Sequence, residues 1–114
     1  MENKRQLALL IPYIVRNGET AVFLQRRDKN AKRLPDYFGF FGGGIEVGET
    51  AEEALLREIK EELEITPINY KLFGQSESDT AVATIFMMKV DENFERTIVV
   101  SEGQYGKFFT KAEV

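Results

Sequence analysis

The chain contains no cysteine and no histidine. Without cysteine it has no disulfide framework, no thiolate nucleophile and no cysteine-based zinc site. Without histidine, serine–histidine hydrolase chemistry, two-histidine metal motifs and imidazole acid–base catalysis are excluded. Any chemistry must therefore use carboxylates, lysine, arginine, tyrosine or a hard metal ion bound by oxygen atoms.

Basic charge and long apolar runs are also scarce. The 114 residues include 15 lysines and arginines against 19 aspartates and glutamates, a net charge of −4, so no basic field favours duplex nucleic acid or an anionic membrane. The longest apolar stretch, Leu7–Val15, is interrupted by Pro12 and is far shorter than the ~20 residues of a membrane-spanning helix. With 43% apolar and 30% charged residues, the composition predicts one globular domain over residues 1–114. The absence of cysteine is compatible with a reducing cytoplasm, which is the expected location.

Local patterns predict a β-rich first half. Leu7–Val15 and Thr20–Arg27 have strand composition, and the Asn17-Gly18 pair between them predicts a hairpin. Asp28–Asp36 is polar and contains a proline, which indicates a loop, and Tyr37–Phe41 is an aromatic run typical of a strand. Three glycines follow, and glycine lets a backbone turn sharply or approach a ligand closely.

A helix is predicted over about residues 50–64. Thr50 and Glu53 form a capping box at its start, and the proline at position 67 forbids its continuation. Leu55, Ile59 and Leu63 lie four residues apart, which gives the helix one apolar face.

The second half returns to strands. The strand segments predicted there are Ile68–Gln75, Thr80–Val90, Thr97–Val100 and Lys107–Phe109, with a loop over Ser101–Gly106. A second capping box at Thr110–Glu113 predicts the start of a C-terminal helix. The given sequence continues for only one more residue, so we expect this helix to be short or missing. The order of elements predicts an α+β fold in which a helix packs on a central mixed sheet.

Three glutamates occupy one side of the predicted helix. Glu58, Glu61 and Glu62 lie at positions i, i+3 and i+4, so their carboxylates project from one face. Like charges at this spacing repel each other unless a cation compensates them. Mg²⁺ or Ca²⁺ suits such an all-oxygen cluster. The spacing alone favours the alternative, a solvated acidic face, because glutamate is a good helix former.

The segment Gly43–Ile65 as a whole resembles the Nudix box of the Nudix hydrolase family. That box is a glycine, five residues, a glutamate, seven residues, Arg-Glu, an aliphatic residue, any residue, Glu-Glu, any residue, glycine and an aliphatic residue. The matching positions are Gly43, Glu49, Arg57, Glu58, Ile59, Glu61, Glu62 and Ile65. One position departs, because Glu64 replaces a glycine of the kind that commonly forms a left-handed helix cap. This departure concerns the helix exit and not the acidic cluster.

The resemblance implies a Nudix-like α/β/α sandwich and a role for each matching residue. The three helix glutamates and the backbone carbonyl of Gly43 would bind the divalent ions, Mg²⁺ or alternatively Mn²⁺. Arg57 and Glu49 would pair with each other and hold the loop against the helix, so Arg57 joins the catalytic set as a supporting member. The general base would be Glu102, whose Glu-Gly-Gln sequence looks like a loop of MutT-type members, or else Glu61 or Glu62.

Residues outside the box are candidates for substrate contacts. Arg26 and Arg27 end a predicted strand beside the site, where either could hold a phosphate; the alternative is an exposed strand-end arginine. Phe40 is a candidate for stacking on a nucleobase, although aromatic residues of a strand are more often core. Glu102 has an alternative as well, that of a solvated loop residue.

The resemblance implies a hydrolase acting on phosphoric acid anhydrides in a nucleoside diphosphate linked to another group. The MutT-like features favour a nucleoside triphosphate, such as 8-oxo-dGTP, converted to a monophosphate and pyrophosphate. Nucleotide sugars, ADP-ribose, dinucleoside polyphosphates and capped RNA ends are alternative substrates. Outside the enzymes, a non-catalytic nucleotide sensor is the alternative, which the intact acidic positions disfavour. A missing C-terminal helix would leave an open pocket, or a homodimer in which a partner covers the sheet.

Overall fold

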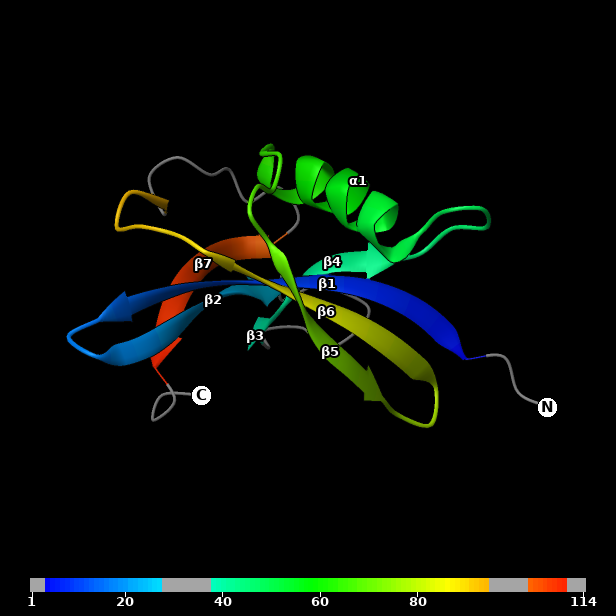
Figure 1. Ribbon diagram of the computed structural model, residues 1–114, viewed down its shortest axis with the longest axis horizontal. Coiled ribbons are helices and arrows are strands. Elements are labelled where there is room, and N and C mark those ends of the chain that lie inside the picture. The colour runs from blue at the N-terminus through cyan, green and yellow to red at the C-terminus, as the bar shows by residue number, and fades with distance from the viewer. Residues whose placement is uncertain (1–3, 28–37, 95–102, 111–114) are drawn as a thin grey trace.

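The computed structural model describes residues 4–27, 38–94 and 103–110. Strands and a single labelled helix account for most of these residues (Figure 1). In chain order the elements are β1 (Arg5–Arg16), β2 (Glu19–Arg27), β3 (Phe38–Gly39), β4 (Phe41–Gly44), α1 (Ala51–Leu63), β5 (Lys71–Glu77), β6 (Ala81–Lys89) and β7 (Gly103–Thr110). The predicted loop over residues 28–36 and the predicted strand over residues 97–100 lie outside the described residues.

Strand β1 is the centre of a mixed sheet. Along one edge it pairs in parallel with β6, from Arg5 opposite Ala81 to Tyr13 opposite Lys89. Its other edge is divided between two antiparallel partners, with β4 on the first half and β2 on the second. Beyond these strands, β5 pairs with β6, and β3 and β7 pair with β2. The mixed sheet predicted from the sequence is confirmed.

Strands β1 and β2 form the predicted hairpin. The turn residues Asn17 and Gly18 have φ values of 51° and 78°, and Arg16 pairs with Glu19 across the turn. Two successive positive φ values are typical of the two-residue turn whose twist matches that of the flanking strands, and Asn-Gly adopts it at low cost.

The structure corrects three predicted strand boundaries. The aromatic run Tyr37–Phe41 is divided at Phe40, because β3 pairs with β2 whereas β4 pairs with β1. The segment Gly103–Gly106, predicted as part of a loop, belongs to β7 because the end of β2 extends far enough to pair with it. β5 begins at Lys71 rather than at residue 68, because Asn69 has a positive φ of 54° that interrupts the extended chain.

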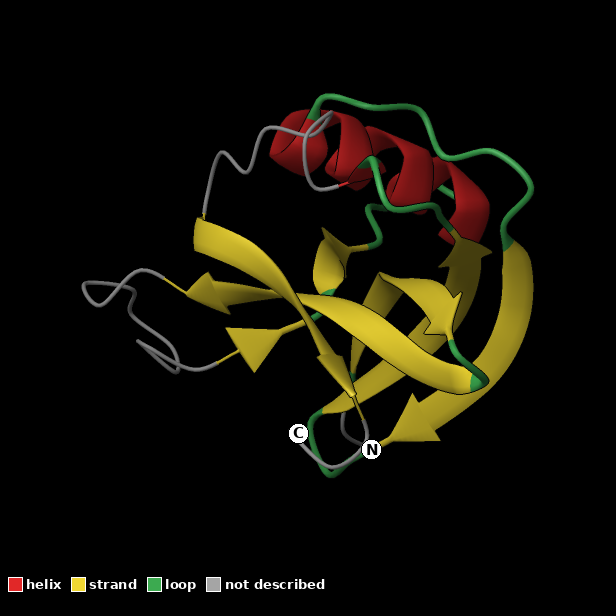
Figure 2. Ribbon diagram, turned by 90° about the vertical axis from the view of Figure 1, so that its left-hand side faces the viewer, coloured by secondary structure: helices red, strands yellow, loops and turns green. Residues whose placement is uncertain are grey.

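Helix α1 covers one face of the sheet, as Figures 1 and 2 show from two directions. The predicted apolar stripe of Leu55, Ile59 and Leu63 is fully buried and belongs to one cluster with Leu10 and Phe41 of the sheet. Burial of each such side chain stabilises the fold by roughly 1.5–3 kcal/mol. The α+β class is therefore confirmed, while the predicted C-terminal helix falls on residues 111–114, outside the described residues.

No helix in the ranges that the structure describes combines the length and the apolar character needed to cross a membrane.

Both ends of α1 are capped by local interactions. The capping box is present, since the amide of Glu53 donates to Thr50 Oγ1 (3.1 Å) and the amide of Thr50 donates to Glu53 Oε1 (2.9 Å). At the other end Glu64 takes the left-handed conformation itself, with φ 59° and ψ 32°, and its amide donates to the carbonyl of Lys60 (3.0 Å). Glu64 thus adopts the helix-exit geometry usual for glycine, although its side chain makes this conformation sterically strained.

We expect Glu64→Gly to stabilise the protein by up to about 1 kcal/mol. Relief of left-handed strain exceeds the added flexibility of glycine in the unfolded chain. Urea unfolding of the two proteins measures the difference. Glu64→Ala is the control, because alanine keeps the strain and should give no gain. Equal stability of all three proteins would contradict this account of the helix exit.

Gly42 occupies a backbone position that a side chain cannot share. Its φ is +127°, and a Cβ there would lie 2.1 Å from the carbonyl oxygen of Ala8 and 2.9 Å from the Cα of Leu9 on β1. Gly48 also has a positive φ, of +88°, but open space surrounds its missing side chain. A side chain at Gly48 would therefore cause backbone strain alone, whereas a side chain at Gly42 would cause both strain and a steric clash.

We expect Gly42→Ala to destabilise the protein by about 2–6 kcal/mol, the sum of backbone strain and overpacking against β1. Gly48→Ala, with strain alone, should cost about 1–3 kcal/mol. Chemical denaturation measures both. A Gly42→Ala cost no larger than that of Gly48→Ala would show that β4 moves away from β1 without penalty.

Candidate functional site

Gly43 lies directly against the carboxylate of Glu58. Gly43 is in the middle of β4, and Glu58 belongs to the helix that packs over this strand. A Cβ on Gly43 would lie only 2.6–2.7 Å from the carboxylate atoms of Glu58. Only glycine leaves room for a carboxylate this close to the strand, so the position brings a main-chain segment and an acidic side chain into one site.

The side chain of Glu62 is bonded to Gly42, the residue before Gly43 on β4. It is 6% exposed, and its Oε1 accepts a hydrogen bond of 2.7 Å from the amide of Gly42. A buried carboxylate needs such donors, because leaving it unpaired away from water costs several kcal/mol. The contact therefore both satisfies Glu62 and fastens the helix to β4.

Arg57 connects the loop after β4 to the helix. Its Nε and Nη2 donate to the two carboxylate oxygens of Glu49 at 2.8 and 2.9 Å, and Nη2 also donates to the carbonyl of Gly44 at 3.0 Å. Glu49 in turn accepts the amide of Glu46 at 2.9 Å. This bidentate geometry gives the ion pair directional specificity. The predicted pairing of Glu49 with Arg57 is present in the structure.

The same guanidinium faces the acidic side of the helix. Its Nη1 lies 3.4 Å from Glu58 and 3.7 Å from Glu61. Part of the repulsion expected among the helix glutamates is therefore compensated by a cation of the chain itself.

The three helix glutamates differ in their surroundings. Glu61 is 53% exposed, whereas Glu58 and Glu62 lie against the glycine strand. Across the described ranges, no three acidic side chains are gathered closely enough, as they are placed in this structure, to form a ready-made metal site. The sequence predicted that the three carboxylates converge; in the structure they have separate partners, with Glu62 bonded to a backbone amide and the other two facing Arg57.

The remaining predicted site residues are placed less completely. Arg26 and Arg27 are the last two residues of β2, but their side chains lie outside the described part of the structure. Phe40 is 41% exposed at the junction of β3 and β4, while the adjacent Phe41 is fully buried and stacks on Phe23 with ring centroids 5.7 Å apart. Glu102 lies outside the described residues.

The ion pair changes the acid–base properties of both partners. Hydrogen bonds from Arg57 and from the backbone of Glu46 lower the pKa of Glu49 from 4.5 to about 2. The hydrogen bond to Glu49 raises the pKa of Arg57 above its usual value. Both groups are therefore charged throughout the neutral range, as a structural clamp requires.

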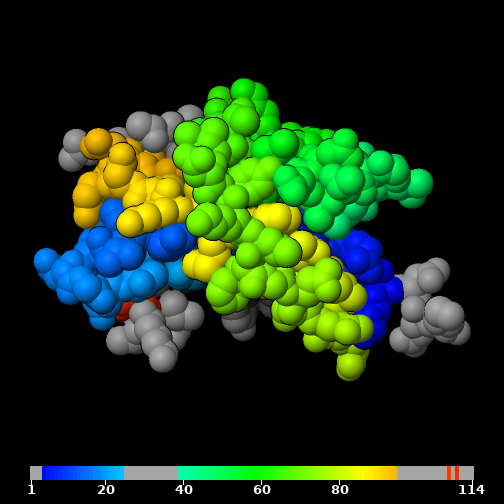
Figure 3. Space-filling model, in the orientation of Figure 1, coloured from blue at the N-terminus to red at the C-terminus, as the bar shows by residue number. Residues whose placement is uncertain are grey.

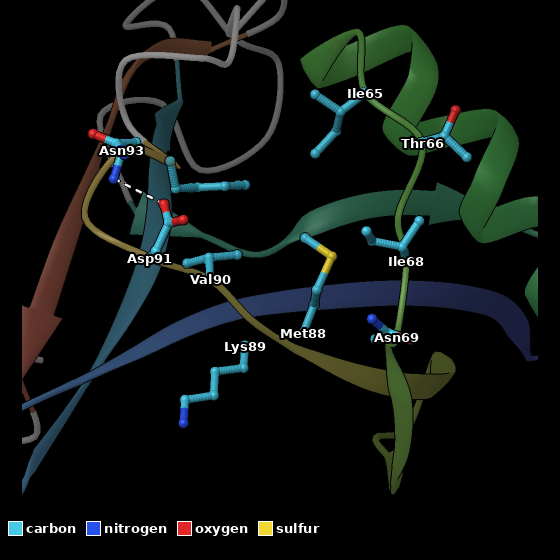
Figure 4. Close-up of a pocket in the computed structure, with 10 residues that line it drawn as sticks. Ile65, Thr66, Ile68, Asn69, Met88, Lys89, Val90, Asp91 and Asn93 are labelled. Atoms are coloured by element: carbon cyan, nitrogen blue, oxygen red, sulfur yellow. Dashed lines mark hydrogen bonds between the residues drawn. The ribbon is translucent and has the colours of Figure 1, made fainter.

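A cavity of about 620 Å³ lies beyond the C-terminal end of α1, where the chain leaving the helix passes the end of β6 (Figure 4). Its lining combines apolar side chains such as Ile65 and Met88 with polar ones such as Asn69 and Asp91, and the amide of Asn93 donates to Asp91 Oδ1 (2.9 Å). None of the site residues predicted from the sequence lines this cavity. Of its lining residues, only Ile65, the last position of the box, had been singled out from the sequence. The two sides of the cavity meet only through tertiary packing, which no local sequence pattern reveals.

The Glu49–Arg57 clamp should make stability depend on pH in a specific window. Because the pKa of Glu49 is lowered on folding, its ion pair contributes stability above pH 4.5 that is lost as the pH falls from about 4.5 to 2. We therefore expect Glu49→Gln to be less stable than the parent at pH 7 and to lose less stability across that window. Urea unfolding at a series of pH values measures both effects.

Glu46→Gln is the matched control, since Glu46 lies 3.9 Å from Arg57 and is 69% exposed. It should follow the parent curve. The Arg16–Glu92 pair, which lowers the pKa of Glu92, is common to all three proteins and cancels in the comparison. Parallel curves for the parent and Glu49→Gln would refute the clamp.

Comparison with known proteins matches this chain to one family. The model of the NUDIX domain family matches residues 4–108. Over 64 residues the chain is 42% identical to the 8-oxo-dGTP diphosphatase of Escherichia coli (strain K12), covering 56% of this chain and 49% of that protein. Over 69 residues it is 35% identical to the dihydroneopterin triphosphate diphosphatase of the same strain, covering 60% and 43%. The chain thus spans about half the length of these curated relatives.

The fold agrees with this match. The crystal structure of a MutT/nudix family protein from Enterococcus faecalis superposes with a TM-score of 0.77 at 16% identity, covering 96% of this chain and 45% of that chain. At such low identity the likeness concerns the fold. Because the family model extends over nearly the whole chain, and the box residues form the junction of β4 and α1, the chain belongs to the NUDIX domain family.

Proposed function

We propose that this protein is a Mg²⁺-dependent pyrophosphohydrolase that cleaves a nucleoside triphosphate. Water would attack a phosphorus atom of the triphosphate, giving a nucleoside monophosphate and pyrophosphate. The observation that carries the proposal is the packing of Glu58 and Glu62 on the glycine strand, which fixes acidic oxygens beside an accessible backbone. The names of two relatives, an 8-oxo-dGTP diphosphatase and a dihydroneopterin triphosphate diphosphatase, support a triphosphate substrate.

The residues at this junction suit a divalent cation. A Cβ at Gly43 would fill the space beside the Glu58 carboxylate, and the donors available are carboxylate and main-chain oxygens, the set that Mg²⁺ prefers. We assign Glu58, Glu61, Glu62 and the carbonyl of Gly43 as the residues that would hold it, with Mn²⁺ as the alternative ion. When bound, the ion would neutralise phosphate charge and lower the pKa of a water molecule.

A carboxylate of the chain would accept the proton of the attacking water. Glu102 is the first candidate, and Glu61 and Glu62 are the others. Of the two helix residues, Glu61 suits the task better, because Glu62 is buried and has one oxygen engaged by the amide of Gly42, whereas Glu61 is about half exposed. Arg57 acts as a positioning residue through its contacts with Glu49 and Gly44.

Substrate recognition would use the neighbouring strand ends. Arg26 and Arg27 lie at the end of β2, next to β3, where a guanidinium would bind a phosphate through charge-assisted hydrogen bonds. Phe40 follows β3 and presents an exposed ring, which suits stacking on a nucleobase. An oxidised purine nucleotide such as 8-oxo-dGTP is the specific substrate that we propose.

We expect Glu58→Gln to retain its fold and to lose Mg²⁺-dependent pyrophosphate release by at least about 10–100-fold, the loss typical even for outer-shell partners of a metal. The change removes one ligand charge with little change of shape. Release of pyrophosphate and phosphate from ordinary nucleoside triphosphates, 8-oxo-dGTP and nucleotide sugars measures it, with circular dichroism to verify folding.

Glu52→Gln is the matched control on the same helix. Glu52 accepts a hydrogen bond from the hydroxyl of Tyr70 (2.9 Å) away from the glycine strand, and glutamine can still accept it. This variant should keep full turnover. Unchanged turnover in Glu58→Gln would contradict the proposed metal site, and equal rates with ordinary and oxidised triphosphates would contradict the preference for 8-oxo-dGTP.

A further inference from the structure

Strand β5 forms an outer edge of the sheet. It pairs with β6 on one side, and no strand pairs with its other side among the residues that the structure describes. In Figure 3 the β5 segment lies on the surface that faces the viewer. Leu72 is 65% exposed and Phe73 is 68% exposed. An open edge of this kind offers backbone donors and acceptors to another strand.

The two ends of β5 carry opposite charges at equal distances from its central residue. Lys71 lies three residues before Gly74, and Glu77 lies three residues after it. Nothing lies within 4 Å of the place where a Cβ of Gly74 would be. A glycine in a strand commonly marks a position where another backbone approaches closely.

We propose that β5 is a self-recognition edge, on which a second copy of this chain adds its own β5 in antiparallel orientation with Gly74 at the two-fold axis. In this register Lys71 lies opposite the partner's Glu77, and symmetry repeats the pair, so both ends of the paired strands carry opposite charges. Such an isologous contact is the commonest way in which a chain forms a closed dimer. The pairing joins the two sheets into one.

The charges favour this orientation over the parallel one. An in-register parallel pair would place Lys71 beside the partner's Lys71 and Glu77 beside the partner's Glu77, and directly opposed like charges are destabilising. Glu77 already contacts Lys4, yet its side chain remains 62% exposed. It therefore retains surface for a second cation.

The apolar residues of β5 add to the same contact. The pairing of β5 with β6 shifts register between Leu72 and Gly74, so Phe73 has no partner on β6. About the proposed axis, Phe73 lies opposite the partner's Gln75 and diagonal to the partner's Phe73. Diagonal neighbours in an antiparallel pair are within reach of aromatic side chains, so dimer formation would remove part of this exposed apolar surface from water.

The test uses the full chain and reverses the charge at Lys71 or at Glu77. Sedimentation velocity over a range of concentrations measures the monomer–dimer equilibrium of each protein. Lys71→Glu alone makes both end pairs acidic, and Glu77→Lys alone makes both basic, so each should weaken the dimer by about tenfold or more. An equimolar mixture of the two variants restores opposite charges and should form a heterodimer. The double variant K71E/E77K should dimerise like the parent.

The salt dependence of the parent provides a second measurement that needs no variant. Its dimer dissociation constant should rise with added NaCl, because the end pairs are exposed to solvent. A parent that stays monomeric at every concentration would overturn the proposal. So would dimers that persist in both single variants, or single variants whose mixture does not associate.

Discussion

The close approach of α1 to β4 is the contact on which the candidate site depends. Three successive glycines of β4 each receive a different residue of the helix: the amide of Gly42 bonds to Glu62, Gly43 lies under the carboxylate of Glu58, and the carbonyl of Gly44 accepts Arg57. These contacts are kept in place by the buried apolar stripe of the same helix, which packs against the sheet beside them. The acidic side chains are thus positioned by hydrophobic packing, and a helix displaced by even a small distance would break all three contacts together.

The same arrangement balances the cost of gathering negative charge. Glu62 is the one buried charged side chain in the described core, and the amide that it accepts reduces its desolvation penalty. Arg57 stands between Glu49 on the loop and Glu58 and Glu61 on the helix. It therefore supports the loop and lowers the repulsion within the acidic face at once. Removing Arg57 would leave the helix carboxylates without this compensation, which explains why a supporting residue belongs to the site as much as its acidic members.

Features set by local chemistry were predictable from the sequence, and features set by distant pairing were not. The Asn17-Gly18 turn and the Thr50–Glu53 capping box are each complete within a few residues, and both are confirmed. The division of the aromatic run at Phe40 and the early start of β7 depend on which strand lies alongside, which no local pattern states. In the site, the resemblance implied that Glu58, Glu62 and the carbonyl of Gly43 share one site, but the hydrogen bond that turns Glu62 toward Gly42 could be seen only in the fold.

The helix also shows how one residue can depart from a family pattern without loss of the site. Glu64 replaces the usual glycine, yet it adopts the left-handed conformation that glycine would supply. The strain is borne because Leu63 is fully buried just before it and Pro67 is buried just after, so packing fixes the direction in which the chain must leave. Glu62 lies only two residues before this cap and is anchored by its own hydrogen bond. The cap and the acidic cluster are therefore held by separate interactions, and the strained exit affects stability without displacing the carboxylates.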